Sequence, residues 1–81
     1  MTEAEIREQL TQVFRDVFDD DSITIHDGMT AKDVSGWDSL NHVNLIVATE
    51  KHFGVRFKTK EVHALENVGE LVALIGHKLT A

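Results

Sequence analysis

The most informative absence in this sequence of 81 residues is cysteine. A chain without cysteine forms no disulfide and offers no thiolate to a metal ion, which suits a reducing cytoplasm. Any thiol chemistry would depend on a group that is added to the protein. We therefore expect a cytoplasmic protein whose modest stability comes from side-chain packing alone.

Long apolar runs are also missing. No stretch approaches the roughly 20 apolar residues that a membrane-spanning helix needs. The first ten residues, MTEAEIREQL, are acidic and amphipathic, unlike a secretory signal or a transit peptide. We expect no insertion into a membrane.

Positive charge is scarce, because 8 Lys and Arg face 14 Asp and Glu and the net charge is -6. Nucleic-acid binding works by replacing counterions with Lys and Arg, so this balance argues against a nucleic-acid partner and favours basic proteins. Residues 38–60 are the exception, since four Lys and Arg outnumber two Asp and Glu there.

The length and composition of the chain are those of a small folded protein. A chain of this size builds one hydrophobic core, so we predict a single domain over residues 1–81. The hydrophobic fraction of 42% and the charged fraction of 27% are typical of soluble globular proteins. A buried active site of many residues would consume too much of such a core.

Helical periodicity dominates the sequence from its first residues. Thr2 followed by Glu5 predicts a capping box at the start of a first helix that ends near the acidic segment 19–22. The inward positions of this helix are Ile6, Leu10, Val13, Phe14 and Val17. A long loop over residues 22–37 follows, in which Ile23 and Ile25 are expected to anchor the chain to the core.

A second helix is predicted to begin at Asp38 or Ser39 and to stop at Gly54. Its expected inward positions are Leu40, Val43, Ile46, Val47 and Phe53. A short helical turn is expected near residues 59–65. Asn67 and Glu70 then cap a last helix with inward positions at Val68, Leu71, Val72, Ile75 and Leu79. The predicted fold is all-α, a small four-helix bundle with a long first loop and a short third helix.

The residues that indicate chemistry are DVSGWDSL at positions 33–40, followed along the predicted helix by apolar residues, Glu50 and Phe53. Here the sequence resembles the acyl carrier protein family. The attachment motif of that family has the form Asp-Leu-Gly-x-Asp-Ser-Leu at the start of its second helix, and the helix ends in Glu-x-x-Phe. The match extends in helix order from Thr2 to Leu79.

The resemblance implies a carrier that is not an enzyme. A phosphopantetheinyl transferase would use coenzyme A and Mg²⁺ to attach 4'-phosphopantetheine to Ser39, and the thiol of this arm would carry an acyl thioester. Asp38 would help to dock the transferase and its metal ion, and Leu40 would contact both the core and partners. A helix start suits a phosphate, because its free N–H groups and positive dipole end favour an anion.

Other readings of these residues remain open. Asp38 and Ser39 can be an ordinary helix cap in an adaptor that lacks the arm. Ser39 and His42 resemble a nucleophile and a base, but a hydrolase would also need oxyanion donors and a group to orient the imidazole. Within the family, a carrier of aminoacyl or other specialised groups is the alternative to a carrier for fatty-acid, polyketide or related synthesis.

The resemblance also implies that the bundle interior can shelter an acyl chain, with Val47, Val62 and Leu65 as candidate lining residues. Trp37 occupies the variable position of the motif and is expected to pack beneath the loop rather than to cover the arm. No metal site built by the protein is expected. The remaining histidines show no ligand spacing, and residues 19–24 lack the ligand pattern of a calcium loop.

The sequence departs from the family along the second helix. Fatty-acid carriers present acidic residues there to basic enzymes, whereas this chain has Asn41, Asn44, Lys51 and His52, followed by basic residues at 56, 58 and 60. Like charges across an interface lower affinity and slow association. We therefore expect a monomeric, pathway-specific carrier whose acyl-loading and acyl-using partners present a less basic or apolar surface.

Overall fold

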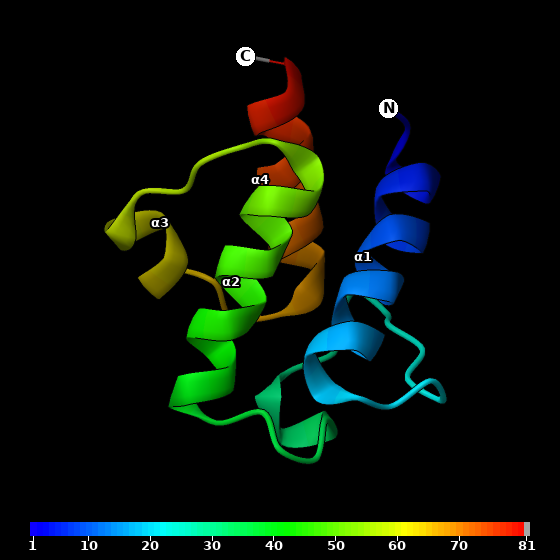
Figure 1. Cartoon of the computed structure of the whole chain (residues 1–81). Coiled ribbons are helices and arrows are strands. Elements are labelled where there is room, and N and C mark those ends of the chain that lie inside the picture. The colour runs from blue at the N-terminus through cyan, green and yellow to red at the C-terminus, as the bar shows by residue number, and fades with distance from the viewer. Residues whose placement is uncertain (81) are drawn as a thin grey trace.

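The computed structural model describes residues 1–80, which form four α-helices and one short 3-10 turn (Figure 1). The elements are α1 (Glu3–Phe18), η1 (Ala31–Asp33), α2 (Ser39–Phe53), α3 (Thr59–His63) and α4 (Val68–Thr80). No strand occurs within residues 1–80. The predicted all-α fold, with a long first loop and a short third helix, is confirmed.

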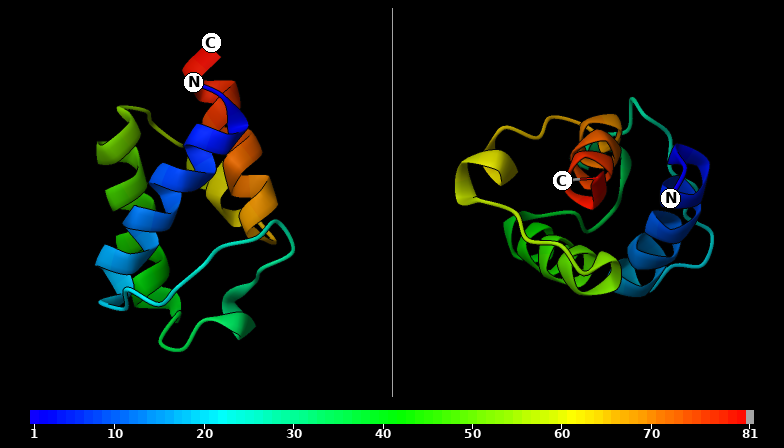
Figure 2. Two further views of the ribbon diagram at one scale, coloured as in Figure 1. Left: turned by 90° about the vertical axis from the view of Figure 1, so that its right-hand side faces the viewer. Right: turned by 90° about the horizontal axis from the view of Figure 1, so that it is seen from above.

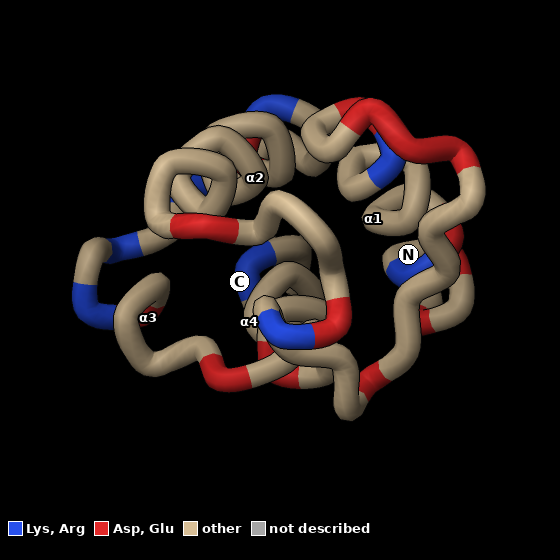
Figure 3. The backbone as a smooth tube through the Cα atoms, turned by 90° about the horizontal axis from the view of Figure 1, so that it is seen from below, with Lys and Arg blue, Asp and Glu red and all other residues tan. Residues whose placement is uncertain are grey.

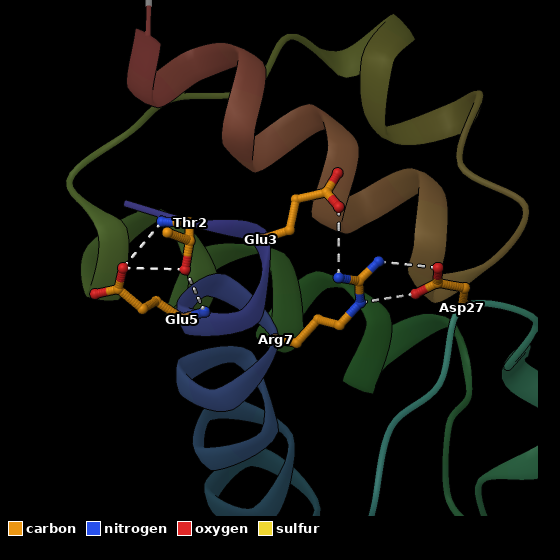
Figure 4. A network of polar contacts seen from close by, with 5 residues as sticks. All are labelled: Thr2, Glu3, Glu5, Arg7 and Asp27. Carbon is orange, nitrogen blue, oxygen red and sulfur yellow. Dashed lines mark hydrogen bonds and ion pairs between the residues drawn. The ribbon is translucent and has the colours of Figure 1, made fainter.

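The first helix begins as its capping box predicts. The Glu5 amide donates to Thr2 Oγ1 over 3.2 Å, and the Thr2 amide donates to Glu5 Oε1 over 3.1 Å (Figure 4). Two of the N–H groups at the helix start are thus satisfied by local side chains. The helix ends at Asp19, whose φ of 50° is left-handed.

Three long helices, α1, α2 and α4, pack around one core, and α3 lies at the side of the bundle away from α1 (Figure 2). The buried apolar residues are Ile6, Leu10, Val13, Phe14, Met29, Val34, Leu45, Ile46, Phe53, Val68, Leu71, Val72 and Ile75. Every predicted inward position of the last helix is buried or packs against this core. The same holds for the first helix.

The predicted inward face of α2 is partly wrong. Leu40, Val43 and Val47 are 71%, 58% and 42% exposed. The core-facing positions of α2 are Leu45, Ile46, Thr49 and Phe53. Both sets follow helical spacing, so α2 has two apolar stripes and periodicity alone does not say which one is buried. Thr49 is tolerated inside because its hydroxyl donates to the Leu45 carbonyl over 2.7 Å.

The long loop is attached to helices on both sides. Asp27 accepts two hydrogen bonds of 2.9 and 3.0 Å from the Arg7 guanidinium on α1 (Figure 4). The carbonyl oxygens of Asp27 and Met29 accept from the amides of Gly69 and Val68 over 2.8 and 2.9 Å. The loop therefore satisfies N–H groups at the start of α4, which a helix start otherwise leaves free.

The short helix α3 is held by an ion pair. Lys78 Nζ on α4 lies 2.9 Å from Glu61 Oε1, and both side chains are less than a quarter exposed. Val62 and Leu65 pack against the core beside it.

Within residues 1–80, none of the helices combines the length and the apolar character needed to cross a membrane.

Candidate functional site

The start of α2 is shaped by a tight turn at Gly36. This glycine has a left-handed φ of 86°, which side-chain-bearing residues rarely adopt. Its carbonyl accepts from the Asp38 amide over 3.0 Å and from Asn41 Nδ2 over 2.6 Å. The turn and the first turn of α2 are thereby fixed to each other. Residue spacing does not reveal this structural role of Asn41.

Asp38 is the N-cap of α2, as predicted. Its Oδ1 accepts from the Asn41 amide over 2.8 Å, and its carbonyl accepts from the His42 amide over 2.8 Å. The residue remains exposed, so the carboxylate can also contact a partner. Whether it helps to dock a transferase and its metal ion stays a prediction.

Ser39 is the first residue of α2 and is exposed. Its hydroxyl therefore lies at the positive end of a 15-residue helix, where free N–H groups favour an anion. Leu40 follows it and is 71% exposed. The predicted core contact of Leu40 is therefore wrong, because the side chain lies on the outer stripe of α2.

An open groove of about 600 Å³ borders Ser39 between α2 and α3. Its apolar residues are Ala31, Trp37, Val43, Val62 and Leu65, and two imidazoles, those of His42 and His63, also border it. Val62 and Leu65 were predicted to line a bundle interior that shelters an acyl chain; they border this open groove, and the sheltering stays a prediction. Val47 instead borders a separate hollow near the end of α2. Periodicity had placed it facing inward.

Two contributors to the groove were not predicted as site residues. Ala31 reaches it from the long loop and His63 from α3, more than twenty residues after Ser39. Neither belongs to a motif, and His63 shows no ligand spacing to the other histidines. Their position depends on how distant elements pack, which short-range spacing does not encode.

Trp37 packs against the core, as expected, and it also borders the groove at Ser39. That it leaves the arm uncovered stays a prediction. Its ring lies 5.4 Å from that of Phe14 in an edge-to-face arrangement and 6.0 Å from that of Phe18, measured between centroids. Such pairs add to the stability gained from burial. The indole of this half-buried residue is therefore fixed by two rings of α1.

His42 is not arranged as the base of a hydrolase. Trp37 Nε1 donates to His42 Nδ1 over 3.2 Å, so Nδ1 has no free lone pair. In the neutral ring the proton must then be on Nε2, which makes that atom a donor as well. A base would need a free lone pair facing the Ser39 hydroxyl. The local geometry argues against proton abstraction by this residue.

The carboxylates whose pKa values are lowered, such as those of Asp27 and Glu61, do not border the groove at Ser39. The guanidinium of Arg7 holds the pKa of Asp27 below its ordinary value of 3.8. A hydrogen bond from the Lys58 amide, aided by Lys78, lowers the pKa of Glu61. Residues 1–80 contain no group of three or more His, Asp or Glu side chains placed to hold a metal ion.

Charge is distributed unevenly over the surface. The Lys and Arg positions of the α2–α3 connection lie beside α3, whereas the acidic run that follows α1 lies on the other side of the molecule (Figure 3). No Lys or Arg among residues 1–80 borders the groove at Ser39. Ser39 and its surroundings fit an attached phosphate. The Ser39 hydroxyl is exposed, the start of α2 is the positive end of the helix, and the groove beside it is largely apolar.

Comparison with known proteins agrees with this geometry. The model of a family described as the phosphopantetheine attachment site matches residues 8–75. The solution NMR structure of a holo acyl carrier protein from Geobacter metallireducens is 46% identical, with a TM-score of 0.86. The match covers 90% of this chain and 84% of that one. No curated protein sequence matches this chain significantly.

Proposed function

The chain belongs to the acyl carrier protein family, and we propose that Ser39 is the residue on which it carries phosphopantetheine. Members of this family are carriers and not enzymes, and their covalent 4'-phosphopantetheine supplies the thiol that forms the acyl thioester. This chain has no cysteine of its own, so the arm is its source of a thiol. The family match does not by itself say which serine is modified.

The observation that carries the assignment is the position of Ser39. It is an exposed hydroxyl at the first residue of α2, capped by Asp38 and bordering the groove between α2 and α3. A transferase can reach this hydroxyl without unfolding the bundle. Ser39 Oγ would attack the phosphorus of coenzyme A that bears the pantetheine. The Oγ–P bond forms as the bond to adenosine bisphosphate breaks, and the hydroxyl proton passes to a base on the transferase.

Intact-mass spectrometry tests this assignment. Incubation with coenzyme A, Mg²⁺ and a promiscuous phosphopantetheinyl transferase should add the mass of one arm to the wild type. Ser39→Ala should abolish the addition, while Ser35→Ala, at an exposed serine of the preceding loop, should keep it. Circular dichroism should show the same helicity for all three. A mass gain in Ser39→Ala would exclude Ser39 as the site.

The same spectrum addresses the alternatives. An adaptor without the arm would gain no mass with any of several transferases. A carrier of aminoacyl groups would gain the arm but would be loaded by a different class of ligase, so the species loaded onto the holo protein separates it from a fatty-acid or polyketide carrier.

The exposed face of α2 supports a pathway-specific partner. Its outer stripe is apolar, with Leu40, Val43 and Val47 at the surface. Glu50 is the single carboxylate within α2, and its Oε2 accepts from the Phe57 amide over 2.9 Å. The helix thus presents almost no free negative charge to a partner. An enzyme that recognises carriers through a basic patch would find few counterparts here, whereas an apolar, weakly acidic surface would fit.

A charge variant tests this expectation. Asn44→Glu combined with Lys51→Gln adds one negative charge and removes one positive charge on the exposed part of α2, a change of two units, and leaves Asn41 in place because its side chain donates to the Gly36 carbonyl. Turnover of the loaded variant by a generic fatty-acid ketosynthase should exceed that of the wild type, and the gain should fade as salt rises. The control, Thr24→Glu with Ala73→Glu, adds the same charge on the long loop and α4. Equal turnover by the α2 variant and the wild type at low salt would refute the charge argument.

A further inference from the structure

Trp37 and His42 form a fixed pair beside the attachment residue. The Trp37 Nε1 atom donates to His42 Nδ1 over 3.2 Å, and the two rings are inclined by only 16° with centroids 6.1 Å apart. Phe14 and Phe18 hold the indole from the side of α1. The orientation of the imidazole is therefore set by the core and not by the solvent.

This contact determines what His42 can offer. An indole N–H only donates, so Nδ1 must accept, and the neutral imidazole carries its proton on Nε2. A surface histidine without such a partner would exchange between both tautomers. His42 therefore presents one fixed donor, Nε2–H, and no acceptor.

His42 and Ser39 are neighbours on α2. His42 is three residues after Ser39 on α2, a spacing that brings two side chains together on one face of a helix at about 5–6 Å between their Cβ atoms. Both residues border the same groove. A phosphodiester on Ser39 would carry a negative charge and only acceptor oxygens. A hydrogen bond to such an anion is shorter and stronger than one between neutral groups.

We propose that His42 is a positioning residue for the prosthetic arm, in which Nε2–H, held by Trp37, donates to the phosphodiester on Ser39. This inference rests on the proposed attachment at Ser39. The bond restrains the first link of the arm and directs the rest along the groove between α2 and α3. Trp37 thus acts on the arm through His42, while its own ring borders the same groove.

Nuclear magnetic resonance of the holo protein provides a readout that does not depend on any enzyme. Long-range ¹H–¹⁵N spectra at pH about 8, where unperturbed imidazoles are neutral, should show His42 as the Nε2–H tautomer alone. Trp37→Phe keeps an aromatic ring against Phe14 but removes the N–H, and should give a mixture of both tautomers. The ³¹P resonance of the phosphodiester should shift in His42→Phe and return toward the wild-type position in His42→Gln, whose amide restores a donor.

His77→Phe is the matched control, because this exposed histidine lies on α4 and does not border the groove. Its ³¹P resonance should equal that of the wild type. An unchanged ³¹P resonance in His42→Phe, or a shift in His77→Phe of the same size, would overturn the proposal. The mass of each sample shows first whether the arm is attached. Samples that never gain the arm refute attachment, whereas attached samples with identical resonances refute only the role of His42.

Discussion

Two glycines of α4, Gly69 and Gly76, should respond to the same substitution in opposite directions. Replacing glycine by alanine within a helix ordinarily stabilises it by about 0.5–1 kcal/mol, because alanine has less backbone freedom to lose. At Gly76 a Cβ would lie 3.6 Å from Ile6 Cδ1, which is an ordinary contact. Gly76→Ala should therefore gain roughly the full amount.

At Gly69 the surroundings reverse the sign. A Cβ there would lie 2.9 Å from Asp27 Cβ and 3.0 Å from the Asp27 carbonyl oxygen. Neither atom can move aside by rotation of a flexible side chain, so the long loop itself must shift. That shift would stretch the bond of 2.8 Å from the Gly69 amide to the same carbonyl, which is worth about 1 kcal/mol. With the cost of overpacking, Gly69→Ala should lose on the order of 1–3 kcal/mol.

Urea unfolding followed by circular dichroism compares the two variants. The midpoint should rise for Gly76→Ala and fall for Gly69→Ala, with the slope of the transition unchanged in both, since neither alters the surface exposed on unfolding. If Gly69→Ala proved as stable as Gly76→Ala, the close approach of the loop to α4 would be wrong.

The remaining predictions concern the core and the response to acid. Phe53→Ala should cost about 3–5 kcal/mol because the ring is only 8% exposed, whereas Leu40→Ala should change the free energy of unfolding by less than about 0.5 kcal/mol. Equal losses in urea melts would mean that the two stripes of α2 are assigned the wrong way round. The pKa of Asp27 is lowered by Arg7, so this pair stabilises the fold above the ordinary value of 3.8 and ceases to do so as the pH falls through the lowered pKa. Urea midpoints measured between pH 7 and about pH 3 should therefore fall less in Asp27→Asn than in the wild type, and parallel curves would contradict this.

Local signals in the sequence predicted the helices well, because their determinants are local. The capping box of Thr2 and Glu5 lies within one turn, and a single apolar stripe places α1 on the core. On α2 the stripe of Leu40 competes with that of Leu45, and only the packing of α1 and α4 decides between them. Met29 is buried in the long loop without any periodicity that could reveal it.

For the candidate site, too, the sequence predicted the features that depend on neighbouring residues and missed those that depend on packing. Ser39 and Asp38 were predicted because the residues around them form a continuous motif at a helix start. The hydrogen bond from Trp37 to His42 was not, although both residues lie in the same stretch, because it depends on the rotamers that Phe14 and Phe18 impose on the indole. Ring orientation is a property of the packed core and leaves no trace in residue spacing.

Two carbonyl groups of the long loop accept hydrogen bonds from the first amides of α4. Exchange of these amide protons therefore reports on whether the loop is bound to the helix. At a helix start such protons have no acceptor within the helix and exchange readily with solvent unless a cap binds them. Here Val68 N–H and Gly69 N–H are bound to Met29 and Asp27, about forty residues earlier in the chain. Deuterium uptake at these two amides that exceeds the uptake of the amides inside α4 therefore measures how often the loop leaves the bundle without unfolding of the helix. Following these two protons before and after modification of Ser39 would show whether loading the carrier loosens or tightens the segment that leads into α2.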